Sequence, residues 1–307
     1  MTSVLVTGAA GLVGQNLIPR LAGCAVSGID KHRANTATLR RLHPAITTIE
    51  ADLAHDDGWQ DAAWAADVVV IAHAQIGGLR GAEFRANNVT ATARLLEVLT
   101  ARPNPPYVVH LSSSVVHSAA GDDYVTTKRE QEALVVASGL PAAILRPTLM
   151  FGWFDRKHLG WLARFMRRVP VFPVPGHGNY LRQPLYAGDF AAIIAACIAR
   201  RPQGAWNISG QEIVSYLALI QALRRANRLR TPIIRIPYAL FASLLRLAAL
   251  VSANPPFTVK QLEALVIPET FEVIDWPGIF GVPATPLARA LEETFNHPVY
   301  AAVELEF

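Results

Sequence analysis

The sequence has few of the features that would place it in several common protein classes. Its 307 residues include only two cysteines, Cys24 and Cys197, which exclude a disulfide framework and are typical of a reducing compartment. No uninterrupted apolar run is long enough to span a bilayer, and Met1-Thr2-Ser3 leads into an expected strand rather than a signal peptide. We therefore expect a soluble intracellular protein, located in the cytoplasm and without a membrane span.

Motifs of other enzyme classes are also missing. The sequence has no His-Glu-x-x-His, no Cys-x-x-Cys, no Walker lysine and no Gly-x-Ser-x-Gly, so we expect no metal site, NTP hydrolysis or triad hydrolase. A net charge of +4 and the lack of a helix-turn-helix or zinc module give no support for nucleic-acid binding. With 51% hydrophobic and 17% charged residues, the chain is not disordered and can bury a large core.

Strand-like and helix-like patterns alternate along the first half of the chain. This alternation is typical of βαβ units and predicts an α/β fold with a Rossmann-type, doubly wound parallel sheet. The expected strands cover 3–7, 25–29, 46–49, 67–72, 107–111 and 143–146. The expected helices cover 12–22, 34–42, 59–65, 81–101 and 124–138.

The chain length predicts two lobes. We expect a dinucleotide-binding Rossmann domain at 1–148, to which 186–208 return, and a smaller C-terminal substrate lobe formed by 149–185 and 209–307. Residues 238–251 form an apolar helical run, interrupted by Arg246, that is too short to span a bilayer and that we interpret as a core helix of the small lobe.

The most informative segment runs from Val4 to Gly14, where a buried strand enters a glycine-rich turn and then a helix. Gly8 permits the tight turn, Gly11 lets backbone N–H groups approach a pyrophosphate, and Gly14 lets the helix pack closely on the strand. The pattern predicts a nicotinamide dinucleotide site at the carboxyl ends of the strands.

Charged residues after the second and third strands refine the cofactor. Asp30 is placed to accept hydrogen bonds from the adenosine ribose and to repel a 2′-phosphate, which favours NAD. Lys31 and Arg33 follow at once and are suited to that phosphate, so NADP stays possible. Asp52-Leu53 is a candidate for the adenine edge, or an ordinary acidic loop.

Ser113, Tyr124 and Lys128 are the candidate catalytic residues. Tyr124 and Lys128 are four residues apart on an expected helix, so the ammonium is expected to lower the phenol pKa and to reach a ribose hydroxyl. A serine at the preceding strand end would hold the substrate oxygen during hydride transfer.

These motifs together resemble the extended short-chain dehydrogenase/reductase superfamily, in particular the NAD-dependent epimerase/dehydratase family that includes UDP-galactose 4-epimerase. Thr7-Gly8-x-x-Gly11-x-x-Gly14 is similar to its cofactor turn, and Ser113-Ser114-Val115-Val116-His117 to its strand-five motif, with Ser113 in the catalytic register and Ser114 as the fallback, substrate-side serine. Asn88-Val89-Thr90 resembles a helix start, which implies a structural or cofactor-side role for Asn88. The similarity runs from Val4 to about Asn207.

The resemblance implies an NAD-dependent oxidoreductase that acts on a hydroxyl or keto carbon, most plausibly of a nucleotide sugar. The alternatives are an NAD(P)-dependent ketone or hydroxysteroid-type reductase and a nucleotide-bound, non-catalytic assembly protein. The resemblance also implies a homodimer through the helices at 81–101 and 124–138. Cofactor contacts beyond those above are expected from Leu12, Val13, Ala72, His73, Ala74, Tyr124, Lys128 and Pro147.

Some positions leave alternatives open. His73 either contacts the cofactor or reacting oxygen or, as we favour, is a hydrogen-bonded structural histidine. Arg182 stands seven residues before Asp189, where the family arginine grips a diphosphate, but a structural pair with Asp189 is an equal alternative. The basic segment 156–168 suits a phosphate-facing lid or an anionic membrane surface, although a solvated helix face is the default. Ser113 and Tyr124 are only eleven positions apart, which indicates a trimmed or differently shaped substrate pocket.

Overall fold

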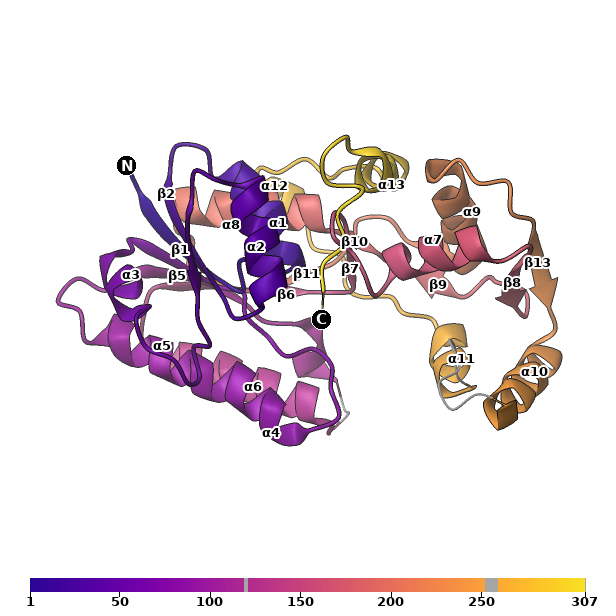
Figure 1. The fold of residues 1–307 in the computed structure, drawn as a ribbon, viewed down its shortest axis with the longest axis horizontal. Coiled ribbons are helices and arrows are strands. Elements are labelled where there is room, and N and C mark those ends of the chain that lie inside the picture. The colour runs from indigo at the N-terminus through magenta and orange to yellow at the C-terminus, as the bar shows by residue number, and fades with distance from the viewer. Residues whose placement is uncertain (119–120, 252–258, 307) are drawn as a thin grey trace.

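The computed structural model describes residues 1–118, 121–251 and 259–306. A large lobe is built around one parallel sheet, and a smaller lobe extends from it (Figure 1). Within the described residues, no helix is long and apolar enough to cross a membrane.

The main sheet has seven parallel strands in the order β11-β6-β5-β4-β1-β2-β3. Their bounds are β1 Ser3–Thr7, β2 Ala25–Asp30, β3 Thr47–Glu50, β4 Val68–Ile71, β5 Tyr107–Leu111, β6 Ala142–Pro147 and β11 Gly204–Ile208. The chain leaves β1 towards β2 and β3 and then crosses to β4 on the other side of β1. The strand order therefore reverses beside β1, where doubly wound sheets bind ligands at their carboxyl ends.

Helices cover both faces of this sheet, and the alternation of side chains along each strand explains why. Val4 and Val6 of β1 pack into one core with helices α1, α2 and α8, whereas Leu5 packs into a second core with α3 and α5. A strand that is apolar on both faces requires a helical layer on each. The helices are α1 Leu12–Leu17, α2 Arg33–Leu42, α3 Gln60–Ala65, α4 Gly81–Phe84, α5 Ala91–Thr100, α6 Asp123–Ala137 and α8 Ala187–Arg200.

The small lobe contains three short strand pairs and its own apolar core. The pairs are β7 Met150–Phe151 with β10 Leu185–Tyr186, β8 Phe172–Pro175 with β13 Ile233–Ile236, and β9 Leu181–Arg182 with β12 Val214–Ser215. Its helices are α7 Leu159–Arg168, α9 Tyr216–Ala226, α10 Tyr238–Val251, α11 Val259–Val266 and α13 Leu287–Asn296.

Two C-terminal segments return to the large lobe. Helix α12 (Trp276–Phe280) packs Trp276 and Phe280 into the core beneath α8. Farther on, Asn35 of α2 donates its side-chain N–H to the carbonyl of Glu306 at 2.6 Å and accepts the Glu306 N–H at 2.7 Å. The end of the chain is therefore fixed to the sheet layer as well as to the small lobe.

The predicted Rossmann-type fold is confirmed, and the strands at 3–7 and 107–111 have the expected bounds. The chain is helical from Gly81 to Thr100, close to the expected 81–101, but a π-helical turn at Arg85–Thr90, which was not predicted, separates α4 from α5. The interpretation of 238–251 as a core helix is wrong. Helix α10 does form there, but Leu240, Leu244 and Leu247 point into solvent with exposed fractions of 53%, 49% and 61%.

Candidate active site

The glycine-rich turn joins β1 to α1, and close backbone contacts explain two of its glycines. Gly8 has a φ of +65°, and a Cβ there would lie 2.8 Å from the carbonyl oxygen of Ala72. A Cβ on Gly14 would lie 2.4 Å from the carbonyl oxygen of Ala9. No side chain fits at either position, so the turn keeps β1, β4 and α1 in close contact. Gly11 is the N-cap residue of α1 and has no side chain to cap the helix.

A cleft opens beside this turn at the carboxyl ends of β1, β2, β3 and β4. The predicted cofactor residues that line it are Gly8, Gly11, Asp30, Asp52, Leu53, Ala72, His73 and Ala74. Lys31, considered above for a 2′-phosphate, also lines it, as do His32, Gln75 and Asn87, which were not predicted as cofactor contacts. The other predicted cofactor residues do not line this cleft: Leu12, Val13, Gly14, Asn88, Tyr124, Lys128 and Pro147. The residues present fit a dinucleotide, because the turn lines the cleft with two glycines, Gly8 and Gly11, and the end of β2 lines it with the Asp30 carboxylate.

Asp30 ends β2 with its carboxylate bound to the backbone on both sides. Oδ2 accepts the N–H of Ala10 and Oδ1 accepts the N–H of His32, each at 3.0 Å. The side chain therefore holds the glycine turn against the β2 end, and it stays at the edge of the cleft. Its binding of a ribose stays a prediction.

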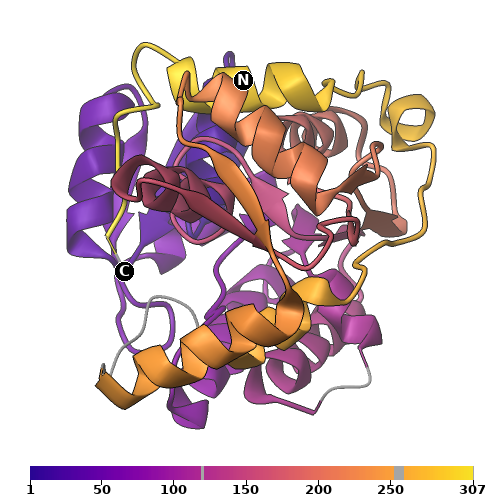
Figure 2. The same cartoon turned by 90° about the vertical axis from the view of Figure 1, so that its right-hand side faces the viewer.

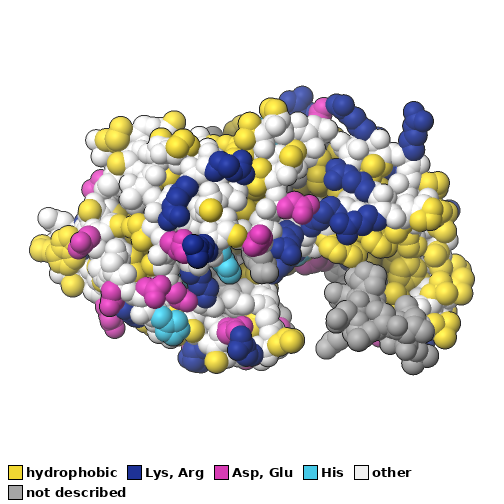
Figure 3. Space-filling view, in the orientation of Figure 1, with side chains coloured by type: hydrophobic (Ala, Val, Ile, Leu, Met, Phe, Trp, Pro, Cys, Tyr) yellow, Lys and Arg dark blue, Asp and Glu magenta, His cyan; other side chains and the backbone are white. Residues whose placement is uncertain are grey.

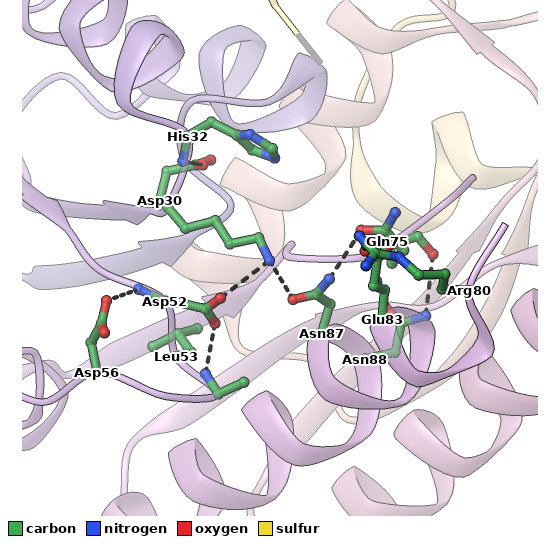
Figure 4. A network of polar contacts seen from close by, with 12 residues as sticks. Asp30, His32, Asp52, Leu53, Asp56, Gln75, Arg80, Glu83, Asn87 and Asn88 are labelled. Carbon is green, nitrogen blue, oxygen red and sulfur yellow. Dashed lines mark hydrogen bonds and ion pairs between the residues drawn. The ribbon is translucent and has the colours of Figure 1, made fainter. Parts of the chain in front are cut away.

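Lys31 connects two walls of the cleft. Its Nζ donates to Asp52 Oδ2 at 3.2 Å and to Asn87 Oδ1 at 2.6 Å, and Asn87 in turn donates to Gln75 Oε1 at 3.0 Å. Figure 4 shows Asp52 and Asn87 pointing towards the same ammonium from opposite sides. Burial raises the pKa of Asp52, but the Ala54 N–H and the Lys31 ammonium outweigh it and hold this pKa below its usual range. No local sequence pattern indicates this bridge, because its members come from separate elements.

His73 is held by two threonines. Its Nδ1 lies 2.7 Å from Thr7 Oγ1 and its Nε2 lies 3.0 Å from Thr92 Oγ1. Burial, assisted by the nearby Lys128 charge, lowers the pKa of His73 to about 3, so the imidazole is neutral at physiological pH. These contacts agree with the favoured interpretation of His73 as a structural residue.

Asn88 lies within the π-helical turn and is fully buried. Its Oδ1 accepts the N–H of Gln75 at 2.7 Å, and its Nδ2 donates to the carbonyl of Gln75 and to Thr127 Oγ1. The amide therefore ties the loop after β4 to α6, which is a structural role. The π-helical turn sets the direction of the Asn88 side chain, which faces inward; in a regular α-helix this side chain would point in another direction.

The candidate catalytic residues lie where β5 meets α6. Ser113 follows β5 and is 8% exposed, and its hydroxyl shares a hydrogen bond with the half-buried Tyr124 phenol. Ser114 begins the next turn and is half-buried, and its contact with substrate stays a prediction. A serine hydroxyl bonded to a phenol is suited to hold one substrate oxygen between two groups that exchange protons.

Lys128 lies one turn after Tyr124 on α6 and is 1% exposed. Its Nζ donates to the carbonyl of Leu111 at 2.8 Å and to Gln131 Oε1 at 2.6 Å. The expectation that Lys128 lowers the phenol pKa is wrong for this arrangement: burial raises the pKa of Tyr124, and the Ser113 hydrogen bond only opposes that rise. Burial also lowers the pKa of Lys128 to about 7, although Glu132 opposes it.

A largely buried ion pair between Glu132 of α6 and Arg146 of β6 lies next to this site. Arg146 of β6 donates from Nε to Glu132 Oε2 at 3.1 Å, and the Ser112 hydroxyl donates to the same carboxylate. Burial raises the pKa of Glu132, but Arg146 and Ser112 together hold it below its usual range. The sequence analysis missed Glu132, although its position four residues after Lys128 is a signal that could have found it.

Arg182 is bound to the backbone of the small lobe. Its guanidinium donates to the carbonyls of Leu265 and Ile267, the latter at 2.9 Å. The alternative of a structural pair with Asp189 is wrong, because Asp189 accepts from the Thr285 N–H at 2.9 Å and from its hydroxyl at 2.5 Å. The binding of a diphosphate by Arg182 stays a prediction. Within the described residues, no group of three or more His, Cys, Asp or Glu side chains is arranged to hold a metal ion.

A parallel doubly wound sheet, a glycine turn and a Ser/Tyr/Lys set at its carboxyl edge define a dinucleotide-binding protein of the short-chain dehydrogenase/reductase type. The sequence profile of the NAD dependent epimerase/dehydratase family matches residues 4–209, and the chain belongs to this family. A sequence comparison with curated proteins finds no significant match.

Solved structures share the fold at low sequence identity. UDP-glucuronic acid 4-epimerase from Bacillus cereus, in complex with UDP-glucuronic acid and NAD, has a TM-score of 0.69 and 21% identity over 95% of this chain and 98% of its own. UDP-N-acetylglucosamine 4-epimerase from Methanobrevibacter ruminantium M1, in complex with UDP-N-acetylmuramic acid, has a TM-score of 0.74 and 16% identity over 95% and 96%. The Bordetella bronchiseptica enzyme WbmF, in complex with NAD+, has a TM-score of 0.71 and 19% identity over 95% and 91%.

Proposed function

We propose that the protein is an NAD-dependent epimerase or dehydratase that acts on a hydroxyl or keto carbon of a nucleotide sugar. The observation that carries this proposal is that the Ser113 and Tyr124 side chains meet where β5 ends and α6 begins, at the carboxyl edge of the sheet, with the buried Lys128 one turn farther along α6. Family membership and fold neighbours that bind NAD and UDP-sugars support it. Residues Gly8, Gly11, Asp30 and Asp52 would hold the dinucleotide.

The side chains divide the proton chemistry between them. Bound NAD would supply the acceptor and donor for hydride at the substrate carbon. The Ser113 hydroxyl orients the substrate oxygen, and Tyr124 takes the proton from it. Because burial raises the pKa of Tyr124, the phenolate needs a compensating positive charge. We propose that Lys128, one turn farther along α6, supplies this charge when cofactor and substrate are bound. An epimerase returns the proton and the hydride within one turnover, without net use of the cofactor.

Cofactor titration tests the first half of the proposal. We expect the purified protein to bind NAD⁺ and NADH more tightly than NADP⁺ and NADPH by isothermal titration, and Asp30→Ala to reduce this preference on the order of tenfold. Asp61→Ala, on α3 outside the cleft, is the control and should leave it unchanged. If protein freed of any co-purified nucleotide binds none of the four, the redox mechanism is wrong.

Activity assays with UDP- and dTDP-sugars test the second half. We expect Tyr124→Phe to reduce turnover by about 10²- to 10⁴-fold, a much larger effect than any change in NAD affinity, since it removes the acid/base group and keeps the ring. Tyr238→Phe, on the exposed helix α10, is the matched control. Net oxidation or reduction of the cofactor on a ketone would favour the reductase alternative, and cofactor binding without turnover would favour an assembly protein.

A homodimer and a cytoplasmic location complete the proposal. Helices α5 and α6 lie side by side on one outer face of the large lobe, where a two-fold interface would join four helices. Light scattering of the full chain tests this state.

A further inference from the structure

The end of the small lobe exposes an apolar helix face that the proposed catalytic function does not use. On α10, Leu240, Leu244 and Leu247 follow each other at spacings of four and three, so that they form one stripe. Tyr238 at the start of the helix is 38% exposed, and Ile234 on the neighbouring strand β13 is 45% exposed. Exposed leucines in one stripe mark a contact surface more often than isolated ones do.

The helix lies at the outer end of the molecule. Figure 2 looks at this end and shows α10 running across the front, beside α11. Ala242 on the opposite face of α10 is buried, which fixes the leucine stripe outward. The hydrophobic side chains gather over β13 and α10 in Figure 3, with Lys and Arg side chains on the lobe above them.

The chain that leads into and through α10 is strongly basic. From residue 213 to residue 262 it has six arginines and one lysine but no aspartate or glutamate, and the next acidic residue is the exposed Glu263 on α11. Among them, exposed side chains that make no ion pair with any described residue are Arg225, Arg228, Arg230, Arg235 and Arg246. A partner that covers the α10 leucines needs an apolar surface, and one that also meets these arginines needs negative charge.

An anionic bilayer surface has both properties. Leucine side chains enter the boundary between headgroups and acyl chains, a tyrosine ring suits the headgroup level, and arginines attract acidic headgroups. We propose that the end of the small lobe binds peripherally to an anionic lipid membrane, with the α10 leucines inserted and the arginines of 225–246 facing the headgroups. A second copy of the chain is a poorer occupant, because like-charged arginines would meet across a two-fold interface.

Vesicle co-sedimentation of the full chain tests the proposal. We expect binding to vesicles that contain phosphatidylglycerol, little binding to phosphatidylcholine alone, and weaker binding as salt rises from about 0.1 M to about 0.5 M. The triple variant Leu240→Ser, Leu244→Ser and Leu247→Ser should bind these vesicles at least on the order of tenfold more weakly. Replacing Arg225, Arg228 and Arg235 by glutamine should remove most of the preference for phosphatidylglycerol.

Matched controls distinguish a specific role of the α10 leucines from a general effect of removing exposed apolar side chains. A second triple variant replaces Leu79, Ile279 and Val299, which have exposed fractions of 102%, 45% and 53%, by serine and should bind as the unchanged protein does. The proposal is wrong if the unchanged protein ignores phosphatidylglycerol vesicles, or if both triple variants bind equally. It is also wrong if light scattering shows a dimer that dissociates only when the α10 leucines are replaced, since a second copy then covers the stripe.

Discussion

At the scale of single residues, the interior accommodates two histidines in opposite ways. Both ring nitrogens of His73 have hydroxyl partners, whereas neither nitrogen of the fully buried His110 has a partner among the described residues. Burial, together with the Lys128 charge, lowers the pKa of His110 well below its usual value. The sequence shows both positions only as histidines near strand ends, so this difference could not be predicted from local pattern.

We expect His110→Leu to stabilise the protein by about 1–2 kcal/mol at pH 7, because it removes two buried polar atoms that lack partners. The unfolded chain protonates His110 below about pH 6.5 and the native state does not, so this group lowers stability as pH falls through that value. Urea unfolding at pH 7 and at about pH 5.5 should show that the variant loses less stability between these two pH values than the unchanged protein does. His73→Leu is the contrasting control and should destabilise, since Thr7 and Thr92 lose their partner. A destabilised His110→Leu protein would contradict the argument.

At the scale of elements, periodicity was enough for the parallel sheet and not for the π-helical turn. Buried β-branched runs predict β1, β4 and β5 because their patterns are complete within each segment. The turn at Arg85–Thr90 depends on Asn88 reaching Gln75 and Thr127, which belong to distant segments. The Lys31 bridge to Asn87 is hidden for the same reason. Residue type and local spacing cannot predict contacts that only the folded chain creates.

Helix α6 joins β5 and β6 through Glu132. Because Glu132 and Arg146 have side-chain exposures of only 12% and 20%, we expect Glu132→Gln to cost about 1–3 kcal/mol. In a double-mutant cycle with Arg146→Met, the coupling should be about 1–2 kcal/mol. Glu130, on the surface of the same helix, pairs with Arg85 of the π-helical turn; this exposed pair is the control and should couple by less than about 0.5 kcal/mol. Equal coupling energies in urea unfolding would refute a special role for the buried pair.

At the scale of the whole molecule, the end of the chain connects the two lobes. Leu305 is 2% exposed and packs with Trp153 and Phe154, which follow β7, and its carbonyl accepts a hydrogen bond from Arg156 at 2.8 Å. One residue later, Glu306 is held by Asn35 of α2. Two adjacent residues thus contact the small-lobe entry and the sheet layer at once. The alternation of apolar and acidic residues over 303–306 predicts at most a short extended segment, and it does not indicate which elements that segment contacts.

This arrangement predicts coupled, not additive, effects. We expect Leu305→Ala to cost about 2–3 kcal/mol and Asn35→Ala about 1–3 kcal/mol in urea unfolding. Each change releases the same segment, so the double variant should lose little more than the worse single variant. Val299→Ala, at a 53% exposed position just before the segment, should stay within about 0.5 kcal/mol. Full additivity would mean that the two contacts act separately, and then the C-terminal segment would not join the lobes as one unit.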